Sequence, residues 1–259
     1  MASQKTEALV LRSVDFGESD RICHLLAPDI GRLTAIAKGA RRSVQRFPGT
    51  LDLFNHLRIS VWRSRSGKMA RLEQATLIES FTSLRSNPAR FALGCFLLEL
   101  LDRLAPEDGA RADTRRLFAF ALFALDAVAT RTPDARLRLL LELRGLDALG
   151  LRPELSACVR CGSAPEDAQV GFHVADGGVL CGRCSARETG LLTLHLGTLR
   201  ALDRVLRLDL KQLDRLVLDR ATLGEARLLV SRFQRFHVGV ELKSQRFLDG
   251  VFSGPAERA

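Results

Sequence analysis

Four cysteines are spaced like the ligands of a metal ion. They form two C-x-x-C pairs, Cys158 with Cys161 and Cys181 with Cys184, separated by residues 162–180. Each pair can place two thiolates on one tight turn, and two such turns complete a tetrahedral set of four sulfur ligands. The separation lies within the range of about 15–20 residues that is typical of zinc sites. The sequence therefore predicts one bound Zn²⁺.

The predicted zinc is structural rather than catalytic, because four protein thiolates leave no open position for water. The segment of roughly 30 residues around the cysteines lies between helical patterns and is too short to bury a core of its own. A metal that contributes on the order of 10–16 kcal/mol could order it. Glycines beside the thiols, Gly162 and Gly182, would let the backbone curl around the metal. The alternatives are two disulfides, a redox-active C-x-x-C, or His173 in place of one cysteine.

Sequence patterns of enzymes are mostly missing. A nucleobase deaminase needs H-x-E together with P-C-x-x-C, but none of the five histidines has Glu two residues later and Ala157 precedes Cys158. The sequence also lacks G-x-x-x-x-G-K-[ST], H-E-x-x-H and G-x-S-x-G. Asp15, Glu18 and Asp20 could hold Mg²⁺ in a nuclease, although such clusters are more often polar loops. We therefore predict that the protein is not an enzyme.

Positive charge is concentrated in the first third of the chain. The 259 residues include 39 basic and 30 acidic side chains, for a net charge of +9. Between Asp29 and Glu73 the only acidic residue is Asp52, whereas ten residues there are basic. Such clustering predicts a polyanionic partner, and DNA is the natural one. The alternative is an adaptor protein that is stabilised by zinc and binds acidic proteins without direct contact with DNA.

Single-stranded DNA is bound by a cationic groove with aromatic stacking surfaces. Trp62 is the best stacking candidate, because its strand alternates and places Leu57, Ile59 and Val61 on the opposite face. A solvated basic loop remains the alternative for the densest cluster, 38–46. The predicted DNA-binding residues are Arg32, Lys38, Arg41, Arg42, Arg46, Arg58, Trp62, Arg63, Arg65, Lys68 and Arg71.

Five strands are expected in the first 80 residues. Short, half-apolar segments there are separated by turn-rich pieces that contain Gly, Ser, Asp and Pro. Five strands in about 75 residues fit a small closed barrel without exposed edges, of which the oligonucleotide-binding (OB) fold is the obvious candidate. The expected strands are 5–12, 21–28, 33–39, 51–62 and 68–79.

The apolar period becomes helical after Asn87-Pro88, a favourable helix start. Helical patterns continue through about 112–130 and 134–150 and return after residue 190. Thr222 and Glu225 have the spacing of a capping box, with Leu229, Phe233, Phe236 and Val240 as the following apolar stripe. The predicted fold is thus a multidomain α+β protein. Its expected parts are an OB domain at 1–82, a helical domain at 83–156 and 191–252, an inserted zinc module at 157–190, and a flexible tail at 253–259.

A membrane location is not expected. The longest apolar run, Leu117 to Leu125, is far shorter than the roughly 18 residues of a membrane span. The N-terminus lacks the apolar core of a signal peptide. We predict a cytoplasmic protein.

Several motifs resemble those of the bacterial RecO family of DNA repair proteins. The resemblance begins at Gly17-Glu18-Ser19-Asp20-Arg21 and spans nearly the whole chain. Its most specific part is Ala37-Lys38-Gly39-Ala40-Arg41-Arg42 together with the zinc pattern. The other matching segments are 31–36, 46–51, 139–155 with the following Cys158 to Gly162, and 243–248.

The resemblance implies a recombination mediator that acts without nucleotide hydrolysis. Such proteins bind single- and double-stranded DNA, anneal complementary strands and, with RecR, help to load RecA onto DNA covered by single-strand-binding protein. The acidic tail of single-strand-binding protein is expected to dock on the helical domain, and the protein is expected at the nucleoid. Lys38, Arg41 and Arg42 match the family's basic motif. The four paired cysteines match zinc positions that some members lack.

Overall fold

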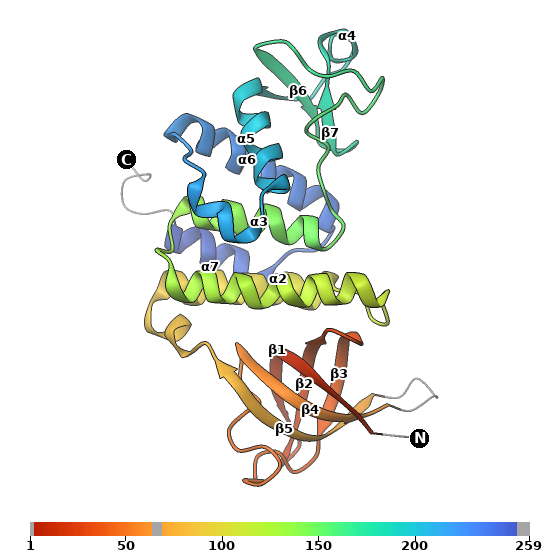
Figure 1. Cartoon of the computed structure of the whole chain (residues 1–259), viewed down its shortest axis with the longest axis vertical. Coiled ribbons are helices and arrows are strands. Elements are labelled where there is room, and N and C mark those ends of the chain that lie inside the picture. The colour runs from red at the N-terminus through yellow and green to blue at the C-terminus, as the bar shows by residue number, and fades with distance from the viewer. Residues whose placement is uncertain (1–2, 64–68, 253–259) are drawn as a thin grey trace. The chain divides into compact units, whose positions relative to one another are not determined.

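The computed structural model describes residues 3–63 and 69–252. The chain forms two compact units (Figure 1). The barrel unit contains the described residues of Met1–Pro133 and Leu242–Ala259, and the second unit contains Asp134–Glu241.

The barrel unit is built around a closed five-stranded barrel with strand order β1-β2-β3-β5-β4. Neighbouring strands are antiparallel, apart from the parallel pair β3 and β5. This is the OB fold, and the prediction of a five-stranded barrel is confirmed. The strands are β1 (Gln4–Phe16), β2 (Asp20–Ala27), β3 (Gly31–Ala37), β4 (Asn55–Trp62) and β5 (Ala70–Ser80).

Strand β4 shows how the sequence pattern builds the barrel. Leu57, Ile59 and Val61 are buried in the interior, whereas Arg58 is exposed and Trp62 half-buried. Alternation along a pleated strand sends successive side chains to opposite faces, so the apolar set fills the barrel and the polar set faces outward. The predicted alternation is confirmed.

Three α-helices complete the barrel unit: α1 (Pro88–Leu104), α2 (Arg111–Thr130) and α7 (Lys243–Phe252), with a 3₁₀ turn η1 (Thr82–Ser86) before α1. The Asn87 side chain accepts hydrogen bonds from the N–H groups of Ala89 and Arg90, so α1 begins where the sequence predicted. Helix α1 contacts β1 and β2, α2 contacts β2 and β3, and α7 packs on α1. A Cβ at Gly94 of α1 would lie 2.9 Å from the Phe54 ring, so the barrel approaches this helix closely.

The second unit combines helices with a small sheet that the sequence did not suggest. Its strands β6 (Gln169–His173), β7 (Gly178–Leu180) and β8 (Leu192–His195) form a sheet of order β7-β6-β8. Val170, Phe172 and Leu194 are buried in it, and the Phe172 ring packs on Phe233, so the region around the cysteines shares the core of the second unit. The helical elements are α3 (Ala135–Ala148), α4 (Gly182–Ser185), α5 (Leu196–Arg207), the 3₁₀ turn η2 (Leu210–Arg215) and α6 (Arg220–Val238).

Helix α6 begins three residues earlier than the predicted capping box requires. Its N-cap is Asp219, whose carboxylate accepts a hydrogen bond from the Thr222 N–H. Glu225 instead accepts hydrogen bonds from the Thr198 hydroxyl and the His195 backbone N–H. The capping-box interpretation is therefore wrong, because a tertiary partner takes the glutamate.

The apolar stripe of α6 is only partly buried. Leu229 and Phe233 are buried, whereas Phe236 and Val240, beyond them in the stripe, are exposed. The helical period therefore predicted the buried face of α6 correctly, but the buried stripe ends sooner than the sequence pattern suggests.

The compact units divide the chain differently from the expected domains. Helices α1, α2 and α7 were assigned to one helical domain at 83–156 and 191–252, but they lie in the barrel unit. The helical period identifies the apolar face of a helix but does not identify the element that covers this face. The limits of the OB domain, the helical domain and the zinc module stay a prediction. Within the described residues, no helix combines the length and hydropathy needed to cross a membrane.

Candidate metal centre and nucleic-acid interface

The four paired cysteines converge in the second unit. Their Sγ atoms all lie within 4.8 Å of one another. Cys161 Sγ and Cys181 Sγ are 3.6 Å apart, close to the roughly 3.8 Å expected between two sulfurs bound to one tetrahedral Zn²⁺ at about 2.3 Å. Four thiols in this arrangement can bind one metal ion.

Each cysteine pair lies on a tight turn held by backbone hydrogen bonds. The N–H of Gly162 donates to the Cys158 carbonyl at 2.8 Å, and the N–H of Cys184 donates to the Cys181 carbonyl at 3.0 Å. Gly162 has φ +77°, a conformation that favours glycine. At Gly182 the requirement is space rather than backbone conformation, because a Cβ there would lie 2.5 Å from the Asp167 carboxylate.

The first turn is joined to the sheet by both backbone and side chain. The N–H of Val159 donates to the Val179 carbonyl of β7 at 3.0 Å. The Arg160 guanidinium pairs with Asp176 at 2.7 Å, and Asp176 also contacts His173 at 3.1 Å. His173 is thus engaged outside the cluster, which leaves the four cysteines as the candidate ligands.

Hydrogen bonding prepares one thiol of the cluster for metal binding. The Ser163 hydroxyl and the backbone N–H of Cys184 lower the pKa of Cys181 to about 6. Hydrogen bonding to Cys181 raises the pKa of Cys184 to about 12. Metal ligands must be thiolates, so Cys181 is ready to bind a metal, whereas Cys184 would release a proton when a cation arrives. This donor set fits Zn²⁺.

On the barrel, the predicted basic cluster forms an ordered loop between β3 and β4, here called the basic loop (residues 38–51). The N–H of Gly39, at φ +67°, donates to Asp20 at 2.8 Å, and the N–H of Arg41 donates to the Ser19 carbonyl at 3.0 Å. The Arg46 guanidinium donates to the Lys38 carbonyl at 2.8 Å. The start of the loop is thereby fixed to the β1–β2 turn.

Carboxylates near the basic loop neutralise it only weakly. Arg41 lies 3.5 Å from Asp15, and Arg42 lies 3.8 Å from Glu18 with both side chains largely exposed. Exposed ion pairs of this kind are worth about 0–1 kcal/mol, so a phosphate could replace them. Neither Lys38 nor Arg46 has an ion pair with a carboxylate of the described residues.

Two other predicted DNA contacts are engaged within the protein. The Arg32 guanidinium donates to the Asp102 carbonyl at 2.7 Å and pairs with Glu107 at 2.5 Å. Arg63 pairs with Asp108 at 2.6 Å. These partners lie at the end of α1 and in the segment before α2, so both arginines join the barrel to its helices.

A second basic group lies on the outer face of β4 and β5. Arg71 is exposed and stands opposite Trp62 in the strand register, and Arg58 lies on the same face of β4. These three residues could present a stacking surface beside two cations. Two further predicted residues, Arg65 and Lys68, lie outside the described residues.

Acidic side chains of the first turn bind a neighbouring arginine and a backbone N–H of the basic loop rather than forming a cation site. Asp15 pairs with Arg21 at 2.9 Å, and Asp20 accepts the Gly39 N–H. Among the described residues, the cysteine cluster is the one group of His, Cys, Asp or Glu placed to share a metal ion. The Mg²⁺ alternative therefore has no support in the geometry.

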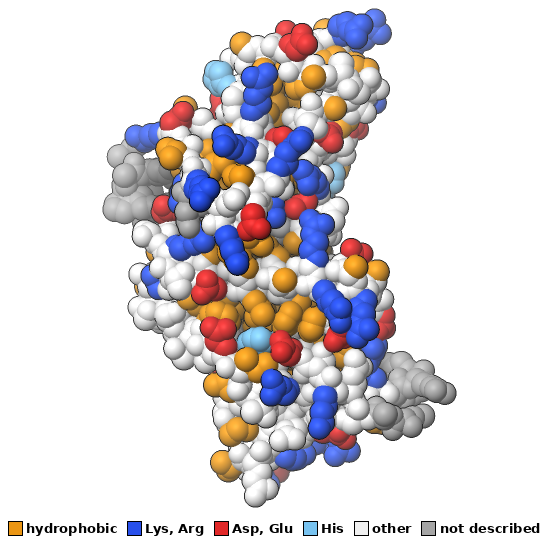
Figure 2. All heavy atoms as spheres, in the orientation of Figure 1, with side chains coloured by type: hydrophobic (Ala, Val, Ile, Leu, Met, Phe, Trp, Pro, Cys, Tyr) orange, Lys and Arg blue, Asp and Glu red, His pale blue; other side chains and the backbone are white. Residues whose placement is uncertain are grey.

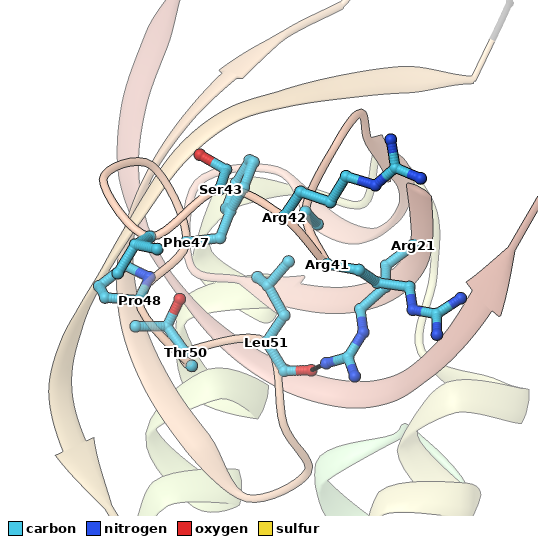
Figure 3. A pocket seen from close by; sticks show the side chains of 11 residues that line it. Arg21, Arg41, Arg42, Ser43, Phe47, Pro48, Thr50 and Leu51 are labelled. Carbon is cyan, nitrogen blue, oxygen red and sulfur yellow. Dashed lines mark hydrogen bonds between the residues drawn. The ribbon is translucent and has the colours of Figure 1, made fainter. Parts of the chain in front are cut away.

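A hollow of about 440 Å³ opens beside the basic loop (Figure 3). Arg21, Arg41 and Arg42 lie on one side of it, and Phe47 and Pro48 lie on the other. Arg21 was absent from the predicted contacts because it lies outside the basic stretch 30–72. On the face drawn in Figure 2, basic and acidic side chains are interspersed on both units.

Two family models match almost the whole chain. Residues 1–81 match the N-terminal domain of recombination protein O, and residues 85–246 match its C-terminal domain. The chain belongs to the RecO family. The boundary between the two RecO models falls between β5 and α1, and the C-terminal model includes all four paired cysteines.

Curated RecO relatives match over nearly their whole length. A DNA repair protein RecO of Anaeromyxobacter dehalogenans (strain 2CP-C) is 37% identical over 95% of this chain and 96% of its own. One from Symbiobacterium thermophilum is 34% identical over 98% and 99%, respectively. One from Myxococcus xanthus is 33% identical over 95% and 96%. The resemblance of the motifs to RecO is confirmed, and with it a role of the family in DNA repair by recombination.

Proposed function

We propose that this protein is a DNA-binding recombination mediator that binds single- and double-stranded DNA and anneals complementary strands. The observation that carries the proposal is the ordered basic loop of the OB barrel, in a chain of the RecO family. Its Lys38, Arg41 and Arg42 are exposed on a fixed backbone. Within the described part of the chain, the two arginines have only weak ion pairs and Lys38 has none.

Annealing follows from charge screening and needs no catalytic step by the protein. Two strands repel each other through their phosphates, and a surface of guanidinium groups reduces that repulsion while the base edges stay free to pair. The outer face with Arg58, Trp62 and Arg71 offers a second surface on the same barrel. The protein would thus act as a binding surface and not as an enzyme.

The proposed partners are RecR, the acidic tail of single-strand-binding protein and, indirectly, RecA at the nucleoid. Support for the acidic tail comes from a second hollow, of about 430 Å³, in the second unit. Its lining combines three arginines with apolar side chains and, among the described side chains, contains no acidic residue. Such a lining suits an acidic peptide with an apolar end. The lining residues are Arg200, Ala201, Arg204, Leu208, Gln212, Arg215, Leu216 and Val217.

The metal of the cysteine cluster is proposed to be one structural Zn²⁺. Cys158, Cys161, Cys181 and Cys184 would hold it, and when bound it would cross-link the two turns through four Zn–S bonds. The four thiolates fill the coordination shell, so the site would stabilise the β6–β7 region rather than act on a substrate.

Binding of the purified chain to a labelled oligonucleotide tests the DNA proposal. Affinity should fall with salt, with a log–log slope of several units if several phosphates are contacted, at about −0.7 per phosphate on a single strand. The double substitution Arg41→Glu with Arg42→Glu should weaken binding by about 10- to 100-fold and flatten the slope.

A matched control reverses two exposed arginines of the second unit, Arg183→Glu with Arg187→Glu. It changes the net charge equally and should leave binding close to that of the unmodified protein. Equal losses in both variants would remove the basic loop as the site. No binding by the unmodified chain without partners would favour the adaptor that contacts acidic proteins alone.

A further inference from the structure

The hollow beside the basic loop has two chemically different ends. Figure 3 shows the guanidinium groups of Arg41 and Arg42 on one side and Phe47 with Pro48 on the other. Leu51 lies between them at the base of the view. An apolar surface next to a cationic one suits a ligand that is itself flat and apolar at one end and anionic at the other.

The apolar end rests on the barrel core and is therefore preformed. Phe47 and Leu51 are 4% and 2% exposed and pack with the interior side chains of the strands. Val44, at the rim, is 80% exposed. An apolar side chain so exposed between Arg42 and Arg46 has no partner in the barrel core, which makes it available to a ligand.

A polar group also lies at the floor. Thr50 lines the hollow, is 2% exposed, and its hydroxyl has no hydrogen-bond partner among the described residues. A buried hydroxyl without a partner is costly. Small shifts of the loop on ligand binding would bring a carbonyl or ring nitrogen of a ligand to it.

The acidic side chains restrict where an anion can lie. Asp15 and Asp52 both contact Arg21, at 2.9 and 3.4 Å, so the charge of Arg21 is largely compensated. Arg42 is the most exposed of the three arginines, and its carboxylate neighbour is 3.8 Å away. A phosphate is therefore expected at Arg42 and Arg41 rather than at Arg21.

We propose that this hollow holds a single unstacked nucleotide of a DNA strand. Its base would lie against the exposed Val44 and Pro48, over a floor formed by Phe47 and Leu51, and its phosphate would lie at Arg41 and Arg42. This inference rests on the proposed DNA binding and names the part of the strand that the loop recognises. It favours a nucleotide over an acidic peptide because Lys38 and Arg46 continue the cationic surface beyond the hollow, as a repeating backbone of phosphates requires. A paired base in a duplex is stacked and cannot enter, so the hollow distinguishes single strands and strand ends.

The test compares two single strands of equal length and charge, one of thymidines and one with abasic sites throughout. A base in the hollow should make the thymidine strand bind at least about fivefold more tightly, as expected when a base stacks on a protein surface. Ala40→Leu adds apolar volume to the wall of the hollow and should lower this ratio by at least about fivefold, to the value that stacking elsewhere on the barrel provides. The abasic strand should bind as before. The control Ala135→Leu makes the same change at a half-buried alanine of the second unit and should keep the ratio.

A measurement on the unmodified protein covers the case in which Ala40→Leu does not fold. Thymidine 5′-monophosphate should shift the backbone NMR resonances of residues 40–51 more strongly than deoxyribose 5-phosphate does. Equal shifts, or a thymidine-to-abasic ratio that Ala40→Leu leaves intact, would overturn the nucleotide site while DNA binding by the loop still stood. Failure of both strands to bind would overturn the proposed function itself, and shifts of 40–51 by an acidic peptide alone would reassign the hollow.

Discussion

The cysteine cluster and the basic loop place charged or ionisable groups at a surface in opposite ways. In the cluster, four side chains point at one another, and Cys158 and Cys181 are buried against a small sheet. In the loop, the cations lie side by side along an exposed surface, and Arg42 is mostly exposed. The first arrangement binds one small ion and fails if any member is lost. The second suits a long polyanion held through many similar contacts, in which each member would contribute a fraction.

The largest effect is expected from removing one ligand of the cluster. Cys158→Ser should abolish stoichiometric zinc and, with it, stabilisation on the order of 10–16 kcal/mol that the metal provides. Hydrogen exchange should show loss of protection in β6 and β7 while the barrel strands stay protected.

The control for this prediction is Cys95→Ser. Cys95 lies outside the cluster. Because burial raises the pKa of its thiol to about 11, it stays protonated. Elemental analysis should find about one zinc per chain in this variant. One zinc per chain in Cys158→Ser as well would show that the metal is held elsewhere.

Two arginines of the predicted DNA set should behave in opposite ways. Arg32→Ala removes the guanidinium that bonds to Asp102 and Glu107 and should lower the free energy of unfolding by about 1–3 kcal/mol. It should leave oligonucleotide affinity almost unchanged. Arg42→Ala should leave stability unchanged and weaken affinity by about two- to tenfold. Denaturant unfolding measures the free energy of unfolding, and fluorescence anisotropy measures oligonucleotide affinity. If each variant lost both stability and affinity, the two arginines could not be divided into a structural one and a DNA-binding one.

A stacking role for Trp62 predicts an effect confined to single strands. Trp62→Ala should weaken binding to single-stranded DNA by about fivefold or more, as expected for the loss of one stacked base, and should leave duplex binding almost unchanged. The control Phe236→Ala removes an exposed aromatic ring of the second unit and should change neither. A loss shared by single and double strands would make Trp62 a structural residue.

The smallest effect concerns the attachment of α7 to α1. Burial raises the pKa of Glu99, but hydrogen bonds from the Ser244 hydroxyl and from the N–H groups of Ser244 and Lys243 outweigh it and hold the pKa below its ordinary value. A carboxylate with a lowered pKa stabilises the fold above its unfolded pKa of about 4.3 and ceases to do so as the pH falls through the folded value. Protection of α7 in hydrogen exchange should therefore be constant at neutral pH and fall below about pH 4.

Glu99→Gln should reproduce that loss at pH 7, at about 0.5–1.5 kcal/mol for each net hydrogen bond weakened. Protection that is the same in the variant and in the unmodified protein across this range would show that apolar packing alone holds α7.

Local patterns predicted the barrel and the cysteine cluster because both depend on spacing. Alternation in β4 and the Asn87-Pro88 helix start needed no knowledge of distant residues. The cluster followed from two C-x-x-C pairs, each of which brings its two thiols together within a single turn.

Other features depended on partners far away in the sequence. Arg32 looked like its neighbour Lys38, but Glu107 lies 75 residues further along the chain and pairs with it. Glu225 had the spacing of a helix cap, but Thr198 and His195 bind it. The sheet β6–β8 was missed because its three strands are only three to five residues long, too short for alternation to be seen.

The return of residues 242–252 to the barrel unit determines how the chain can be divided. The second unit is an insertion, since the polypeptide leaves the barrel unit after Pro133 and re-enters it at Leu242. A truncation that ends the chain before α7 would therefore remove a helix that packs on α1. Excising 134–241 and linking Pro133 to Leu242 would keep α1, α2 and α7 together with the barrel, which no single cut of the chain can do.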